Sequence, residues 1–490
     1  MANYENNITR NNTRFKELAT KLDKVLIKFH NDINIICNSS VHLSRNHPEY
    51  LGLWKNVVYK RNLSIMDYLN GIILLSRSFM YFIISILLEF IRFSSYHPKS
   101  NSKSSEIDFM FISHQIANKV TDGDFYFGEI IHDLAARNKN VIRLLISHTK
   151  SSHNQIESGT YLTKFLNKPL RKFVILNYFL LNLYSLFRLL LFCLKNQFTF
   201  YEIISLLTGQ LTNFSLIKIM NNLEFELSLW RPKNLIITYE GNAIERAVFL
   251  LSKKYGTRTF GYQHAPLIQS QYSILRRLNS ELDPDVILCS GPYSKSKFVS
   301  KIGGDKPILT LGSPKFKKFI NRGGIFEKEE SILLVPDGNR QSIDNFVNLG
   351  LLLVSSSYTG KVIIRSHSLF YKYLESKTNI FVEDNSRGLF ISQGDLNKDL
   401  KLSKWVVYEN SSVAIQAMFE GCNIIYITNP LTNIDPLWEH TEYRSTAESS
   451  FEIKSIIDSF DPTKCASPQE IHNIGKLYFS ELNLNILNLK

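Results

Sequence analysis

Short apolar runs alternate with segments of helical period through most of this chain. In a first series, the apolar runs at 107–113 and 234–240 each precede an amphipathic segment. In a second series, the run at 331–338 leads into a helical segment, and further apolar runs follow at 361–367 and 405–428. A strand followed by a helix, repeated along the chain, is typical of parallel α/β architecture. The pattern therefore predicts two Rossmann-like α/β domains.

The two series are separated by a stretch without an apolar period, at about 316–331. Gly323 and Gly324 stand there among charged residues, which is typical of a linker. The predicted organisation is a helical N-terminal region at 1–105, an N-terminal Rossmann-like domain at 106–320 with an apolar insertion near 150–230, and a C-terminal Rossmann-like domain at 321–490.

Two longer apolar stretches stand outside this alternation. The stretch at 71–93 is interrupted by Arg77 and Glu89, which leaves too short a charge-free run to cross ~30 Å of hydrocarbon, so a buried or interfacial helix is expected. The stretch at 173–194 contains one charge, Arg188, and has basic residues on both flanks. Such symmetry favours a helix lying in an anionic leaflet. A buried helix and a membrane span remain as alternatives.

Composition narrows the classes of function. Of the 490 residues, 44% are hydrophobic and 21% charged, which is typical of a folded globular protein, and the net charge of +13 favours an anionic partner. We find no motif typical of nucleic-acid-binding modules, so nucleic acid is not an expected partner. The five cysteines form no metal-binding pattern, and the amino terminus does not read as a secretory signal. The predicted location is cytoplasmic, peripherally associated with the inner membrane.

Two turns of the second series carry candidate ligand-binding residues. Asn410, Ser411 and Ser412 lie between a strand and a helix, where small hydroxyl residues leave backbone amides free for phosphate. A plain helix cap is the alternative. Arg365 and His367 end the preceding strand on one side of the chain, and both can bind a phosphate or carboxylate. A surface charge beside a partly exposed histidine is the alternative here.

A third turn of this series contains Asp337 and Gly338, before a helix whose cap is expected at Ser342. Asp-Gly is first a turn signal and only second a ligand signal. All three turns would nevertheless project from the carboxyl edge of one parallel sheet, where open α/β folds bind ligands.

The first series offers candidate catalytic residues at the matching edge. Glu240 and His264 follow consecutive strands, and the carboxylate of Glu240 could act as a base or as a nucleophile. The alternatives are a carboxylate that stabilises a helix start and a buried, hydrogen-bonded histidine. No DxD loop or metal-ligand spacing is found, so a metal-independent mechanism without a cofactor is expected.

These residues resemble the GT-B glycosyltransferases of bacterial capsule and lipopolysaccharide assembly, especially those that use CMP-activated acidic sugars such as sialic acid or Kdo. PDG at 336–338, RSHS at 365–368 and NSS at 410–412 are similar to the motifs that bind the CMP donor in that group. YEG at 239–241 and GYQHA at 261–265 resemble segments of surface-carbohydrate biosynthesis proteins. The resemblance implies two domains that face each other across a cleft.

The sequence departs from this group at three positions. Ser368 stands where the group has proline, Gln416 where many members have a nucleotide-contacting glutamate, and Asn423 where proline is common. The amide of Gln416 can still hydrogen-bond a ribose or a base, so it is retained as a donor-binding candidate.

The resemblance implies transfer of a CMP-activated acidic (ulosonic) sugar to a growing bacterial surface glycan. The expected partners are a nucleotide-sugar donor, a lipid-linked or oligosaccharide acceptor and the inner-leaflet membrane surface. Two alternatives remain open: a non-catalytic scaffold of envelope assembly, and a phosphotransferase that uses a CDP-linked polyol donor.

Overall fold

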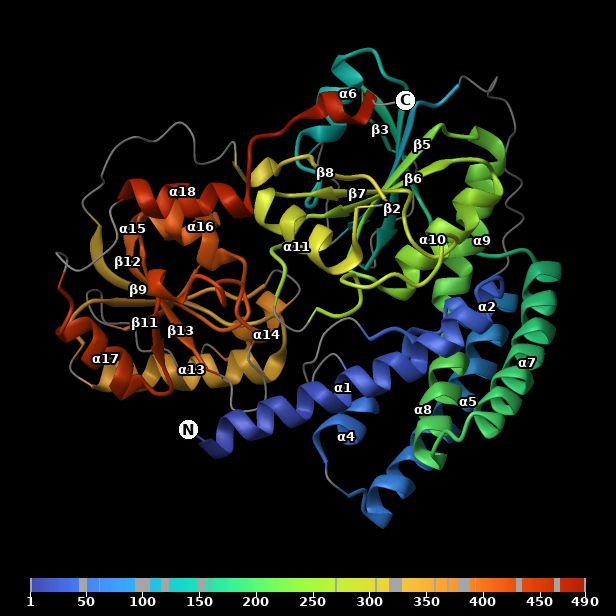
Figure 1. Cartoon of the computed structure of the whole chain (residues 1–490), viewed down its shortest axis with the longest axis horizontal. Helices are drawn as coiled ribbons and strands as arrows, with labels where there is room; N and C mark the ends of the chain where they lie inside the picture. Colours follow the sequence, from blue (N-terminus) through green and yellow to red (C-terminus); the bar gives the residue numbers. More distant parts are fainter. Residues whose placement is uncertain are drawn as a thin grey trace.

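Two largely parallel β-sheets, each enclosed by helices, lie side by side in the computed structural model, with a group of long helices beside the first sheet (Figure 1). The structure describes residues 2–43, 51–60, 62–92, 106–115, 123–148, 156–158, 160–268, 271–304, 306–316, 328–356, 358–367, 370–377, 388–392, 394–428, 434–461 and 468–488. The predicted α/β class with two Rossmann-like domains and a helical N-terminal region is confirmed.

The first sheet has the strand order β3-β4-β2-β1-β5-β6-β7-β8, in which β3 alone is antiparallel to its neighbour. Its strands are β1 (Phe109–Gln115), β2 (Val141–Ser147), β3 (Ile156–Ser158), β4 (Tyr161–Phe165), β5 (Asn234–Thr238), β6 (Arg258–Gln263), β7 (Val286–Cys289) and β8 (Ile308–Thr310). Helices α6 (Ile130–Ala136), α10 (Ala243–Lys254) and α11 (Pro292–Ile302) belong to this domain. The central strands are apolar on both faces because helices or loops cover both.

The second sheet is parallel throughout, in the order β11-β10-β9-β12-β13-β14. Its strands are β9 (Glu329–Val335), β10 (Lys361–Ile364), β11 (Leu389–Ile391), β12 (Ser403–Tyr408), β13 (Asn423–Ile427) and β14 (Ser445–Ala447). Its helices are α13 (Arg340–Ser355), α14 (Tyr371–Glu375), α15 (Leu396–Leu402), α16 (Val413–Phe419), α17 (Ser450–Asp458) and α18 (Pro468–Tyr478), with a 3-10 turn η4 (Thr441–Tyr443). Side chains alternate between two cores: Leu333 joins one, and Ile332 and Leu334 join the other.

The N-terminal helices and the apolar insertion form a single helical body, although they are far apart in the sequence. Its elements are α1 (Ala2–Lys28), α2 (Ile33–Ile36), η1 (Ser39–Val41), α4 (Trp54–Tyr59), α5 (Ile65–Ile91), α7 (Lys172–Lys195), α8 (Phe200–Leu211) and α9 (Phe214–Trp230). Buried Asn38 donates a hydrogen bond to the carbonyl of Leu206, 2.9 Å away. Gly209 permits this contact, since a Cβ there would lie 2.1 Å from Ser40 Oγ.

The end of the chain returns to the first domain. The backbone N–H of Ser480 donates to Ser290, and that of Asn483 donates to Leu311. The side chains of Leu484 and Leu487, in η6 (Leu484–Asn488), join the core beside the first sheet. Residues 480–488 thus depart from the predicted 321–490 domain, and the predicted linker at 316–331 lies mostly outside the described residues.

Candidate functional site

A cleft of about 670 Å³ opens between the carboxyl ends of the two sheets, and both domains line it. All ten predicted site residues lie on its walls: Glu240, His264, Asp337, Gly338, Arg365, His367, Asn410, Ser411, Ser412 and Gln416. They meet because the carboxyl ends of parallel strands share one edge of a sheet. Two Rossmann-like domains facing across a cleft is the arrangement that the GT-B resemblance implies.

Glu240 projects from a rigid turn after β5. The carboxylate of Glu245, in the first turn of α10, accepts hydrogen bonds from the backbone N–H groups of residues 240, 241 and 242. Gly241 has a φ of +80°, and a Cβ there would lie 2.6 Å from Ser273 Cβ, so this turn requires glycine. Glu245, and not Glu240, therefore accepts the backbone hydrogen bonds at the start of α10.

Burial, and after it the charge of Glu240, raises the pKa of the Glu245 carboxyl to about 8, while the three amides act in the opposite direction. Glu240 itself keeps 24% of its side chain exposed in the cleft. Its Oε1 lies 4.0 Å from Nε2 of His264. The predicted carboxylate and imidazole thus meet on one wall of the cleft, at the ends of the neighbouring strands β5 and β6.

Tyr126, His114 and His148 lie near this pair and were not predicted from the sequence. The ring of Tyr126 packs edge-on against His264 with centroids 4.8 Å apart, and against His114 at 5.9 Å. Nδ1 of His114 lies 2.9 Å from Nε2 of His148. Burial, followed by the neighbouring His148, lowers the pKa of His114 to about 4, although Glu240 acts in the opposite direction. A signal for the two histidines was present in the sequence, because the tripeptide Ile-Ser-His occurs at the carboxyl ends of both apolar runs, at 112–114 and 146–148.

On the opposite wall, Asp337 forms hydrogen bonds within its own turn. Its carboxylate accepts hydrogen bonds from the N–H of Gly338 and the side-chain amide of Asn339, at 2.7 and 3.2 Å. Asn339 caps α13 by accepting from the N–H of Ser342, so the cap expected at Ser342 was wrong. Ser342 instead donates to Glu409. Gly338 leaves open space beside the turn, since the atoms nearest to a Cβ there belong to His367, 3.9 Å away.

Arg365 and His367 both face the cleft, but their surroundings differ. Nη1 of Arg365 donates to the Asp399 carboxylate at 2.6 Å and also to Ser392 Oγ and the carbonyl of Gly394. His367 is exposed, and its ring lies 6.3 Å from that of Phe125 in the other domain. Partial desolvation in the cleft lowers the pKa of His367, against the charge of Asp337. Arg365 is thus a paired, positioned cation, whereas His367 is presented to the cleft.

The serine turn lies at the start of α16 and lines the cleft. Ser412 is the N-terminal cap of α16, yet its side chain makes no capping hydrogen bond to the described residues. Ser411 Oγ accepts a hydrogen bond from the N–H of Val413 at 3.3 Å. The buried Nδ2 of Asn410 has no hydrogen-bond partner among the described residues, and the same holds for Oγ of Ser366, which also lines the cleft. Buried polar atoms are normally paired with protein, water or a ligand, so these two are candidates for contact with a bound molecule.

Gln416 is 7% exposed and lies on the cleft wall, as predicted for a nucleotide contact. Of the two other departures from the resemblance, Ser368 lies outside the described residues, and Asn423 begins β13 away from the cleft lining. Among the residues that the structure describes, no cluster of three or more His, Cys, Asp or Glu side chains could hold a metal ion.

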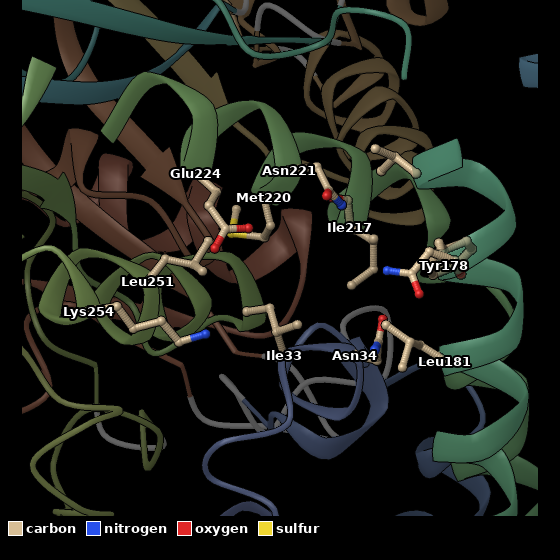
Figure 2. Close-up of a pocket in the computed structure, with 12 residues that line it drawn as sticks. Ile33, Asn34, Tyr178, Leu181, Ile217, Met220, Asn221, Glu224, Leu251 and Lys254 are labelled. Atoms are coloured by element: carbon tan, nitrogen blue, oxygen red, sulfur yellow. The ribbon is translucent and has the colours of Figure 1, made fainter. Parts of the chain in front are cut away.

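A second, smaller cavity of about 170 Å³ lies between α2, α7, α9 and α10. Figure 2 shows Lys254 and Glu224 on one side of it and Tyr178 on the other. Tyr178 already donates a hydrogen bond to Asn213. None of the ten predicted site residues lines this cavity, so the large cleft is the candidate site.

No protein-family model and no curated protein sequence matches this chain. Among solved structures, S. aureus MnaA with UDP has 9% identity and a TM-score of 0.46, over 78% of this chain and 94% of the other. The glycotransferase of kitacinnamycin has 9% identity and a TM-score of 0.44, over 76% and 95%. The UDP-GlcNAc 2-epimerase from Neisseria meningitidis, bound to UDP-GlcNAc, has 12% identity and a TM-score of 0.42, over 78% and 98%. These values are too low to say anything of substrate, and the two sheets themselves define the fold.

Proposed function

We propose that this protein is a glycosyltransferase that takes a sugar from a nucleotide-activated donor. The observation that carries the proposal is the cleft, on which two parallel sheets place a carboxylate from one domain opposite phosphate-binding groups from the other. Open α/β folds bind ligands at this edge of the sheet, and a cleft of about 670 Å³ has the size of a small-molecule site.

The donor is proposed to bind the C-terminal wall. Gly338 leaves room for a phosphate to approach the backbone, and His367 supplies a hydrogen-bond donor beside it. The buried Nδ2 of Asn410 and Oγ of Ser366 would find their partners in the nucleotide. Gln416 offers an amide for the ribose or base.

We propose a CMP-linked acidic sugar as the donor and a metal-independent transfer without a cofactor. Support comes from the motif resemblance and from the cleft wall, where the cations Lys315 and Arg365 would offset the charge of the leaving phosphate and His367 would donate a hydrogen bond to it. The acceptor would be a lipid-linked or oligosaccharide chain of a growing bacterial surface glycan.

In the proposed reaction, Glu240 removes the proton from the acceptor hydroxyl. The acceptor oxygen then forms a bond to the anomeric carbon of the sugar, and the bond from that carbon to the phosphate oxygen breaks. The nucleotide leaves with the electron pair, and the C-terminal wall stabilises its negative charge. His264, 4.0 Å from Glu240, would stabilise the ionised form of this base.

Calorimetric titration of the full chain with CMP, CDP, UDP and GDP tests the proposal. We expect saturable binding of one nucleotide, with CMP as the prediction from the resemblance. Binding of none of the four would exclude the transferase and support a non-catalytic scaffold. Formation of new phosphodiester bonds in a product assay would instead indicate the CDP-polyol phosphotransferase.

A further inference from the structure

Two long apolar helices, α5 and α7, lie beside α8 at the outer edge of the helical body (Figure 1). With 27 and 24 residues, they are about 40 and 36 Å long at 1.5 Å per residue. Both are long and apolar enough to cross a membrane, with mean hydropathies of 2.0 and 1.7 over 18-residue windows. Only 17% and 28% of those windows are buried within the protein.

The polarity of α5 is inverted relative to a soluble protein, whereas the buried side of α7 mixes polar positions with Ile175, Tyr178, Leu189 and Cys193. The positions that α5 buries are largely polar or small: Asp67, Gly71, Ser78, Phe82 and Glu89. On α7 the buried stripe includes Asn182, which accepts a hydrogen bond from Gln210 at 2.7 Å, and Ser185, which donates to Asp32. Small and polar residues therefore face the protein, as in helices that pack within membranes.

The outward surface of the two helices is almost wholly apolar, and we call it the α5–α7 face. Its side chains that are at least 47% exposed are Ile65, Met66, Leu69, Ile73, Phe79, Met80, Tyr81, Ile84, Leu87, Ile91, Phe173, Leu176, Leu180, Tyr184, Phe187, Leu191 and Leu194. Soluble monomers seldom expose a continuous patch of this extent, and such patches mark interaction surfaces. Something apolar is therefore expected to cover this face.

We propose that the α5–α7 face is inserted into one leaflet of a membrane, with both helices lying in the membrane plane. The sequence predicted a peripheral attachment, and this proposal replaces it with insertion among the acyl chains. The proposal goes beyond glycosyl transfer and does not depend on it, because it concerns a surface remote from the cleft.

The body of the protein follows both helices along their length, which favours lying in the plane over crossing. At the start of α5, Asp67 pairs with Lys60 at 2.5 Å. At its end, the buried Glu89 pairs with Lys218 and accepts a hydrogen bond from the N–H of Leu170. Because both ends of α5 are held against the same helical body, a crossing would carry part of that body into the bilayer.

Polar residues on the exposed side of α7 follow one flank. Asn177, Tyr184, Arg188 and Lys195 are spaced by seven, four and seven residues, which places them along one line of the helix, although Arg188 turns to the protein and pairs with Asp32 at 2.7 Å. On α5, Asn70, Arg77 and Tyr81 repeat the same spacing of seven and four. Such flanks suit helices half-immersed at the level of the headgroups, and the basic residues among them favour an anionic leaflet.

Flotation with lipid vesicles tests the insertion. The full chain should float with phosphatidylethanolamine–phosphatidylglycerol vesicles and remain bound in 1 M NaCl, because burial of apolar surface is not screened by salt. The triple variant Met80→Asp, Leu180→Asp, Phe187→Asp should lose at least about tenfold in partitioning. The control is Phe451→Asp, which changes a 79%-exposed phenylalanine in the C-terminal domain and should float like wild type.

The depth of single tryptophans distinguishes an in-plane helix from a span and does not depend on the aspartate variants folding. Met66→Trp, Met80→Trp and Ile91→Trp lie on one face of α5, since their spacings of 14 and 11 residues are close to whole helical turns. Lipids brominated at known acyl positions should quench all three at similar depth. Deep quenching at 80 with shallow quenching at 66 and 91 would show a span and overturn the proposal.

Two other outcomes would also overturn it. If the chain stays unbound to vesicles, or leaves them in 1 M NaCl, the face is not inserted. If it forms a soluble dimer that the three aspartates dissociate, a second copy covers the face. Nucleotide titration of each variant separates this proposal from the transferase proposal, since the variants leave the cleft unchanged and should bind nucleotide as wild type does.

Discussion

The two walls of the cleft are built in opposite ways. On the N-terminal wall, His264 lies 4.0 Å from Glu240 and packs against Tyr126, whose ring also packs against His114 of the histidine pair. On the C-terminal wall, Arg365 is paired with Asp399 of the same domain. The buried Nδ2 of Asn410 and Oγ of Ser366 have no hydrogen-bond partner among the described residues. We propose that the first wall carries the chemistry and that the second wall binds the donor.

The largest expected effect is on turnover, from Glu240→Gln. Loss of the base should slow the reaction by about 10²–10⁴-fold, whereas the affinity for the nucleotide should change little because Glu240 lies on the other wall. Steady-state kinetics with nucleotide titration measures both. Glu281→Gln, outside the cleft, is the matched control. Turnover at the wild-type rate in Glu240→Gln would show that Glu240 is not the base.

The next effect is on donor affinity, from Asn410→Ala. A buried amide that hydrogen-bonds the donor should contribute about 1 kcal/mol, so the Kd should rise by roughly fivefold. Because Nδ2 of Asn410 has no partner among the described protein residues, the melting temperature without nucleotide should not fall. A lower melting temperature with unchanged affinity would mean that Asn410 serves the fold and not the donor.

Arg365 and His367 should separate stability from binding. His367→Ala removes an exposed group, so it should weaken donor binding at little cost to folding. Arg365→Ala should weaken donor binding and also destabilise the domain by about 1–3 kcal/mol, because it leaves Asp399 without its cation. Chemical denaturation and titration of both variants test this difference. Equal stability in the two variants would show that the Arg365–Asp399 pair does not support the fold.

The smallest expected effect is on the pH dependence of stability. The pKa of His114 is lowered from 6.5 to about 4 in the folded state, so the unfolded chain binds more protons between these values. Stability should therefore fall as pH drops from 6.5 towards 4. His114→Gln should reduce that slope, measured by denaturation at a series of pH values. If stability changes with pH in His114→Gln as it does in wild type, a group other than His114 is responsible.

The cleft residues could be predicted from sequence because their positions follow from one rule, the shared carboxyl edge of parallel strands. Tyr126 was missed because the segment before it has no period, and only the repeated Ile-Ser-His marked the histidine pair. The cap was assigned to Ser342 because hydroxyl residues are common caps, whereas Asn339 occupies the earlier position.

The local sequence pattern predicted the helices of the helical body but not how they pack. The period of 71–93 and 173–194 predicted helices correctly, but it contains no information on the partner of each helix. Arg77 and Glu89 were read as interruptions of an apolar stretch. In the structure Glu89 faces inward to Lys218, which leaves the apolar residues outside. Burial of charge inside the protein can be seen only in three dimensions.

The central claim is that the C-terminal wall binds the nucleotide while Glu240 acts on the sugar or acceptor. Its most direct test is calorimetric titration of wild type and Glu240→Gln with CMP, beside a turnover assay with CMP-activated acidic sugars. The account predicts the same saturable Kd for both proteins and turnover only in wild type. Absence of nucleotide binding in wild type, or full turnover in Glu240→Gln, would contradict it.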